Sequence, residues 1–176
     1  ALPPHAPPDD PAPQPLRPLS VLLVTHNLNL EGAPLIAFEF ACHLAALPGW
    51  RVRVVSPEDG PLRERYAEAG LEVELADVRP ALAAKTAEEF DAALARLAVQ
   101  LDFTSVDIVA ANTMVAFWSV LIADRLGKPS VLYTHESVSV RRFFAPHLAP
   151  PLIAAAESAF VRATRVVFSA AASQKV

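Results

Sequence analysis

The stretch that decides the fold is LSVLLVT at residues 19–25, followed by the loop HNLNLEG at residues 26–32. A nearly continuous apolar run of this length is typical of a strand that is buried on both faces, as in a parallel sheet. Pro34 can occupy the first turn of a helix after the loop. The apolar residues that then recur at helical spacing are Ile36, Phe40, Leu44 and Leu47. The stretch therefore begins a β/α repeat.

The same alternation continues to the end of the chain. Further strands are predicted at residues 51–55, 71–75, 107–111, 130–134 and 165–168. Helices are predicted at residues 61–70, 86–101, 114–126 and 151–161, and loops at residues 76–85 and 138–150. Strands that alternate with helices pair in parallel through right-handed crossovers. The sequence therefore predicts an α/β, Rossmann-like doubly wound parallel sheet of about six strands in the order 3-2-1-4-5-6. Its ligand site would lie at the carboxyl ends of strands one, four and five.

The first 18 residues differ in composition from the rest. They hold eight of the 17 prolines, which exclude a helix or a central strand. We interpret residues 1–18 as a proline-rich linker and residues 19–176 as one domain, a number that suits the chain length. A linker at the front suggests that another module precedes this one.

Composition and charge narrow the function classes. Hydrophobic residues make up 53% of the chain and the net charge is −4. Arg141-Arg142 is the only adjacent basic pair, so nucleic acid is not expected as a partner. A single cysteine allows no internal disulfide, and no signal peptide is recognisable. We expect a cytoplasmic protein, and peripheral association with a membrane through a partner domain stays open. The longest near-apolar run, residues 108–123, is too short to span a bilayer.

The candidate site residues follow the predicted strands. Gly32 stands where a loop enters a helix, and such a junction offers free N–H groups and a positive dipole to an anion. The alternative is a glycine needed only for the turn. His135, after the strand at 130–134, could donate to a substrate hydroxyl or phosphate, or act as a base. Glu136 and His26 are weaker candidates of the same kind, and a structural role is the alternative for all three.

Asn112 and Thr113 end the strand at 107–111. They either cap the next helix or hydrogen-bond a ligand. Known motifs give no other site: the sequence lacks G-x-G-x-x-G, the P-loop pattern, H-E-x-x-H and G-x-S-x-G. No metal site is expected, because the histidines show no close ligand spacing. Trp118 is interpreted as a core residue.

Together these features resemble the N-terminal domain of GT-B-type glycosyltransferases of family 4, over about residues 19–173. The matching parts are VLLVTH at 21–26, LEGAP at 30–34, YTHE at 133–136 and RVVFS at 165–169. The resemblance implies two Rossmann-like domains that face each other across a cleft, with the acceptor on this one. The nucleotide-sugar donor would bind mainly to a C-terminal domain of the same protein, usually without a metal or other cofactor.

The resemblance also assigns roles. Gly32 and Ala33 would approach the donor phosphates, although many members carry a second glycine where this chain has Ala33. His135 would lie near the donor sugar as the catalytic candidate. The implied reaction moves a sugar to an acceptor hydroxyl, on a carbohydrate or glycolipid, with retention of configuration. We expect the 176-residue chain alone to be inactive.

Residues 138–150 are our hypothesis for an acceptor-facing loop. Arg141 and Arg142 would suit an anionic acceptor, and a solvated surface is the alternative. Two other functions stay open. One is a non-catalytic Rossmann-like binding module. The other is a nucleotide-dependent epimerase or dehydrogenase, which the missing G-x-G-x-x-G disfavours.

Overall fold

The computed structural model describes residues 18–169. All but the last residue of the predicted linker, and the last seven residues of the predicted domain, lie outside the described residues. The strands are β1 (Leu19–Val24), β2 (Trp50–Ser56), β3 (Val73–Leu75), β4 (Ile108–Asn112), β5 (Ser130–Thr134) and β6 (Arg165–Phe168). The helices are α1 (Gly32–Ala45), α2 (Leu62–Glu68), α3 (Arg79–Leu82), α4 (Ala87–Gln100), α5 (Phe117–Arg125), α6 (Val140–Phe144) and α7 (Pro150–Arg162). Two 3-10 helices are η1 (Phe103–Ser105) and η2 (Met114–Ala116).

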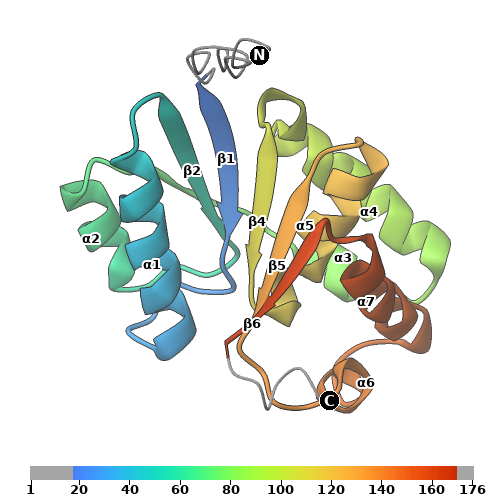
Figure 1. Cartoon of the computed structure of the whole chain (residues 1–176). Helices are drawn as coiled ribbons and strands as arrows, with labels where there is room; N and C mark the ends of the chain where they lie inside the picture. Colours follow the sequence, from blue (N-terminus) through green and yellow to red (C-terminus); the bar gives the residue numbers. More distant parts are fainter. Residues whose placement is uncertain (1–17, 170–176) are drawn as a thin grey trace, which may run out of the picture.

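The six strands form one parallel sheet in the order β3-β2-β1-β4-β5-β6, which confirms the predicted topology (Figure 1). Val24 of β1 pairs with Val55 of β2 on one side and with Ala111 of β4 on the other. The chain order reverses between β1 and β4, and their carboxyl ends lie at the same edge of the sheet. Loops that leave these two strands therefore diverge and open a crevice between them.

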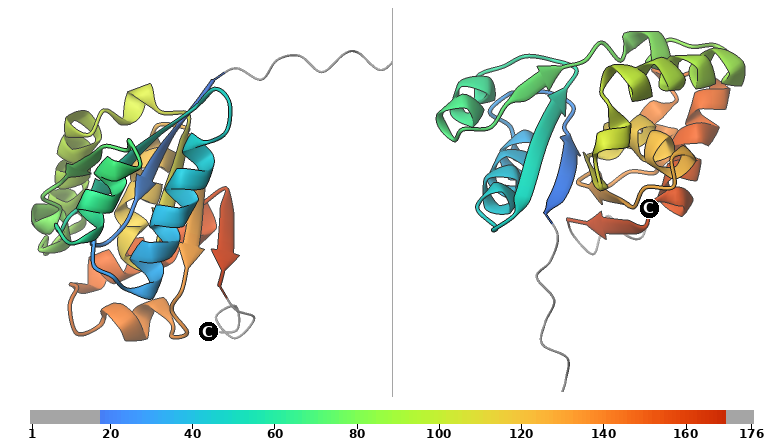
Figure 2. Two further views of the ribbon diagram at one scale, coloured as in Figure 1. Left: turned by 90° about the vertical axis from the view of Figure 1, so that its left-hand side faces the viewer. Right: turned by 90° about the horizontal axis from the view of Figure 1, so that it is seen from above.

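Helices cover both faces of the sheet, with α1 and α2 on one side and α4, α5 and α7 on the other (Figure 2). The side chains of β1 alternate accordingly. Leu22 and Val24 belong to the large core with α4, α5 and α7, and Val21 and Leu23 belong to the smaller core with α1 and α2. Trp118, 1% exposed, lies in the large core, as predicted. Burial on both faces explains why β1 has hardly a polar residue.

Two local predictions were wrong, and one predicted helix is present but begins with a 3-10 turn. The predicted loop at 76–85 contains α3, whose start is fixed by the Asp77 carboxylate, which accepts from Arg79 N at 3.1 Å. The predicted loop at 138–150 contains α6, held by Phe144, which packs on Phe117 at a ring distance of 5.4 Å. The predicted helix from residue 114 opens as η2 before α5 begins. Helices of three to five residues are too short to show a hydrophobic period.

Candidate functional site

A buried amide at the end of β4 joins three elements at the carboxyl edge of the sheet. Asn112 is 3% exposed. Its Nδ2 donates to the carbonyl oxygen of Ala33, in the first turn of α1, at 2.9 Å. Its Oδ1 lies 2.9 Å from Nε2 of His135, which follows β5. Nδ2 also lies 3.5 Å from Oγ1 of Thr25, which follows β1 and donates to the carbonyl oxygen of Asn27 at 3.3 Å. The structure thus brings together Ala33, Asn112 and His135, three of the predicted site residues.

His135 is half-buried and its ring packs on that of Tyr133, with centroids 4.3 Å apart. Burial lowers the pKa of the imidazole below its ordinary value; Glu136 opposes this shift and His26 adds to it. A lowered pKa favours the neutral ring at neutral pH, the form that can accept a hydrogen bond or a proton.

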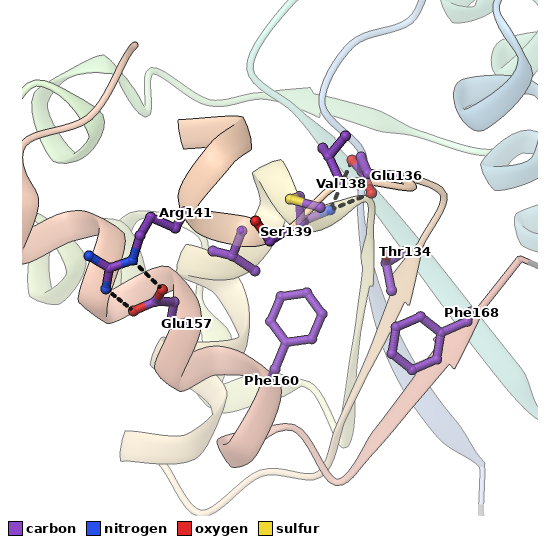
Figure 3. Close-up of a pocket in the computed structure, with 10 residues that line it drawn as sticks. Thr134, Glu136, Val138, Ser139, Arg141, Glu157, Phe160 and Phe168 are labelled. Carbon is purple, nitrogen blue, oxygen red and sulfur yellow. Dashed lines mark hydrogen bonds and ion pairs between the residues drawn. The ribbon is translucent and has the colours of Figure 1, made fainter. Parts of the chain in front are cut away.

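Glu136 acts on the neighbouring backbone. Its carboxylate oxygens accept from Met114 N at 3.3 and 3.4 Å (Figure 3). One of them also accepts from His135 N at 3.0 Å. Thr113 occupies the N-cap position of η2, yet its side chain makes no capping hydrogen bond. Glu136 therefore caps the start of η2, a role that the sequence analysis considered for Asn112 and Thr113. The charge of this carboxylate also lies at the start of η2, where it meets free N–H groups.

Thr113 adopts a backbone conformation that glycine ordinarily occupies, with φ 81° and ψ 156°. It is 3% exposed, and its hydroxyl has no hydrogen-bond partner. Its N–H donates to the carbonyl oxygen of Tyr133 at 2.7 Å, which extends the β4–β5 pairing by one residue. Strain of this kind costs about 1–3 kcal/mol and persists where the surroundings fix the backbone.

Gly32 begins α1 and is exposed. Its φ lies outside the left-handed region, and a Cβ built on it meets no atom within 4 Å. Neither the backbone conformation nor the packing of the described residues therefore requires glycine here. The geometry of the described residues therefore gives no support to a glycine needed only for the turn. Open space beside the first N–H groups of a helix is what an approaching anion requires.

His26 lies beside a second hollow at the same edge. Its Nδ1 is buried without a hydrogen-bond partner. Burial lowers its pKa, which Glu31, Glu136 and Glu58 oppose. The hollow has a volume of about 240 Å³; other polar residues that line it are Thr25, Asn27, Glu58, Asp77 and Arg79. Glu58 and Asp77 were not predicted, because they follow β2 and β3, away from the predicted site at strands one, four and five, and no motif marks them.

A third feature is the pocket of about 270 Å³ below the loop after β5 (Figure 3). Phe160 of α7 and Phe168 of β6 point into it, and Glu136 lies at its rim. Arg141 also lines this pocket, but its guanidinium pairs with Glu157 at 3.1 Å. Residues from α7 and β6 could not be assigned to a site from the sequence, because only the fold brings them together.

The structure does not bring every candidate into one place. Arg141 lines the pocket below the loop after β5 and is not part of the hydrogen-bond network around Asn112. Arg142 is exposed on α6. Within residues 18–169, no three His, Cys, Asp or Glu side chains are grouped so that they could hold a metal ion. Over the same residues, no helix has the length and apolar character to cross a bilayer.

Comparison with known proteins gives a family match and several structural matches. The model of Glycosyltransferase Family 4 matches residues 31–175. The crystal structure of Anabaena HepE with UDP and glucose superposes with a TM-score of 0.65 at 20% identity, and the match covers 88% of this chain and 39% of that one. The UDP-GlcNAc 2-epimerase of Neisseria meningitidis, bound to UDP-GlcNAc, gives 0.56 at 14% identity, with 89% and 42% covered.

A putative UDP-N-acetylglucosamine 2-epimerase from Listeria monocytogenes gives a TM-score of 0.57 at 13% identity, covering 91% of this chain and 41% of that one. At these identities the likeness shows a shared fold. The chain spans about two fifths of the length of each of these structures. No curated protein sequence matches the chain.

Proposed function

Because this chain belongs to glycosyltransferase family 4, we propose that it is the acceptor-side half of a retaining glycosyltransferase. The reaction moves a sugar from a nucleoside diphosphate to a hydroxyl of a carbohydrate or glycolipid acceptor. A C-terminal domain of the same protein supplies the facing wall of the site and most contacts to the nucleotide. The match to two fifths of HepE, a protein crystallised with UDP and glucose, supports this division.

The observation that carries the proposal is the link from Ala33 through Asn112 to His135. It fixes the first turn of α1, beside the open space at Gly32, relative to the imidazole. An anion at the helix start and a polar group held at a set distance from it match the two parts of a nucleotide sugar. The diphosphate meets the N–H groups, and the sugar meets His135.

The chemistry follows from this arrangement. The bond between the anomeric carbon and the diphosphate oxygen breaks, the acceptor oxygen forms a bond to the same carbon, and the acceptor's hydroxyl proton passes to the departing diphosphate. Negative charge grows on the leaving diphosphate, so N–H groups already directed at it lower the barrier. The proposal includes no metal and no organic cofactor. Because half of the charge-stabilising groups belong to the other domain, the 176-residue chain is expected to be inactive alone.

The test is sugar transfer by the intact protein. It is incubated with UDP-glucose and other nucleoside diphosphate sugars in the presence of oligosaccharide and glycolipid acceptors. We expect release of the nucleoside diphosphate and a product whose anomeric configuration, read by NMR, equals that of the donor. Turnover by the 176-residue chain would contradict its inactivity. An intact protein that only binds favours the binding-module reading, and an epimerised sugar favours the epimerase reading.

His135 gives a sharper test of the same proposal. His135→Ala in the intact protein should lower turnover at least about tenfold, the order expected for one polar contact at the reacting centre. His43→Ala is the control, since His43 is an exposed histidine in the last turn of α1, away from this edge. Equal losses in the two variants would contradict a role of His135 at the reacting centre.

A further inference from the structure

The direction of each hydrogen bond around Asn112 can be deduced. A carbonyl oxygen only accepts, so the Asn112 atom that lies 2.9 Å from the oxygen of Ala33 must be Nδ2. Oδ1 of the same amide therefore faces Nε2 of His135, also at 2.9 Å. Because an amide oxygen only accepts as well, Nε2 of His135 carries a proton.

Thr25 supports this assignment from another direction. Its hydroxyl donates to the carbonyl oxygen of Asn27 at 3.3 Å, so its lone pairs are left to accept from Nδ2 of Asn112. Exchanging the two ends of the amide would set its oxygen against the oxygen of Ala33. At 3% exposure Asn112 is shielded from bulk solvent, and an unpaired buried polar group costs about 1–3 kcal/mol.

We propose that Asn112 is a positioning residue that holds His135 as the Nε2–H tautomer and ties it to the first turn of α1. This inference rests on the proposed glycosyltransferase function. In the neutral ring only Nδ1 then has a free lone pair. His135 thus meets the substrate as an acceptor. The group that faces it is a sugar hydroxyl, which can donate, and not a phosphate oxygen, which cannot.

This inference narrows the sequence-based reading of His135. That reading included a donor to a hydroxyl or phosphate as well as a base. The neutral ring has one N–H, at Nε2, and it donates to Oδ1 of Asn112. The ring therefore has no N–H left to donate to a substrate. The diphosphate is left to the N–H groups of α1, which the same asparagine fixes through Ala33. One side chain, Asn112, thereby fixes both the sugar-binding part and the phosphate-binding part of this wall.

NMR of the 176-residue chain, labelled with ¹⁵N-histidine, tests the tautomer without any need for activity. We expect an Nε2–H proton of His135 that exchanges slowly with water, and an unprotonated Nδ1, at neutral pH. Asn112→Leu removes the acceptor and should make that proton exchange fast. Asn112→Asp keeps an acceptor and adds charge, so it should raise the pKa of His135 by about one unit or more.

Two controls keep the result specific. The titratable groups that act on His135 are Glu136 and His26, and neither is altered in these variants. Asn29→Asp places the same charge in the loop after β1 and should move the pKa of His135 less than Asn112→Asp does. Backbone amide spectra report whether each variant folds, and Asn112→Asp answers the question if Asn112→Leu does not fold.

Kinetics of the intact protein complete the test. Asn112→Asp should shift the low-pH limb of the kcat profile to higher pH, in step with the raised pKa of His135. A merely structural role of Asn112 would not produce this shift. A ring protonated at Nδ1 in the unchanged chain, or a pKa unmoved by Asn112→Asp, overturns the inference. An intact protein without transferase activity refutes the proposed function but leaves the NMR assignment of the tautomer standing.

Discussion

Gly32 follows the loop that leaves β1, and Thr113 follows the neighbouring strand β4 directly. A glycine stands where the backbone does not require one, and a threonine stands where the backbone conformation is typical of glycine. Gly32 has an ordinary φ and open space around its missing Cβ, so nothing in the described chain requires glycine. Thr113 has φ 81° and is buried, a conformation that normally requires glycine. Local conformational preference therefore explains neither residue.

The contrast separates two causes of residue choice. Gly60, in the loop after β2, represents the ordinary case: a Cβ there would lie 2.6 Å from the backbone of Leu28. Packing within the chain requires that glycine. At Gly32 nothing within the described residues requires glycine, which leaves space for the ligand that we propose at the start of α1. At Thr113 strain is retained where β4 meets the network around Asn112.

Gly60→Ala should have the largest effect. The added methyl group meets the backbone of Leu28, whose carbonyl oxygen also accepts from Leu62 N at 2.9 Å. Displacing that backbone should lower the free energy of unfolding by about 2–3 kcal/mol, in the range for overpacking. Urea unfolding followed by circular dichroism measures the change. A loss below about 0.5 kcal/mol, the scale of an ordinary surface substitution, would mean that the loop yields easily and would break the contrast with Gly32.

Gly32→Ala should affect activity instead of stability. The free energy of unfolding should stay unchanged or rise by less than about 1 kcal/mol, because alanine favours the helix. Turnover of a nucleotide sugar by the intact protein should fall about tenfold, which corresponds to about 1.4 kcal/mol. Unaltered turnover would show that no ligand approaches this position closely.

Thr113→Gly should stabilise the protein by about 1 kcal/mol, because the relief of backbone strain exceeds the loss of one buried methyl group. Asp102→Gly is the matched control, since Asp102 has φ 41° and ψ 59°, a left-handed conformation that aspartate tolerates. Its gain should be smaller. Thermal or urea unfolding of both variants decides this, and a destabilised Thr113→Gly variant would mean that the threonine side chain contributes more than the strain costs.

The smallest effect concerns pH. The pKa values of His26 and His135 are lowered in the folded protein from an unfolded value of 6.5. Below about pH 6.5 the unfolded chain therefore binds more protons than the folded one, and stability falls as pH falls toward the folded values. Urea unfolding at about pH 7.5 and about pH 5.5 should show this loss. His26→Gln and His135→Gln should each reduce it; an unchanged pH dependence in both would assign it to other groups.

The fold was predictable because its signals are local and repeated. A doubly buried strand such as β1 must be apolar along its whole length, and the helices between strands show a clear period. Connection rules then left one strand order. α3 and α6 were missed because four or five residues show no period, and tertiary contacts such as that of Phe144 with Phe117 hold α6.

The site was predictable only as a set of positions. Strand ends pointed to His26, Asn112 and His135, since parallel strands present their carboxyl ends together. The sequence could not show that Asn112 contacts both Ala33 and His135, because these contacts join residues 79 and 23 positions apart. Glu157 and Phe168 line the pocket below the loop after β5. The sequence could not assign them to it, because they too are far along the chain from that loop.

The sequence by itself determined the order of strands and helices, the topology of the sheet and the edge where polar side chains gather, because hydrophobic periodicity and chain connectivity act along the chain. Only the tertiary structure decided which polar atoms meet and which glycine has open space beside it. Hydrogen-bond direction and steric clearance depend on distances of a few ångströms between residues far apart in the chain. Those distances exist only once the two cores have packed against the sheet.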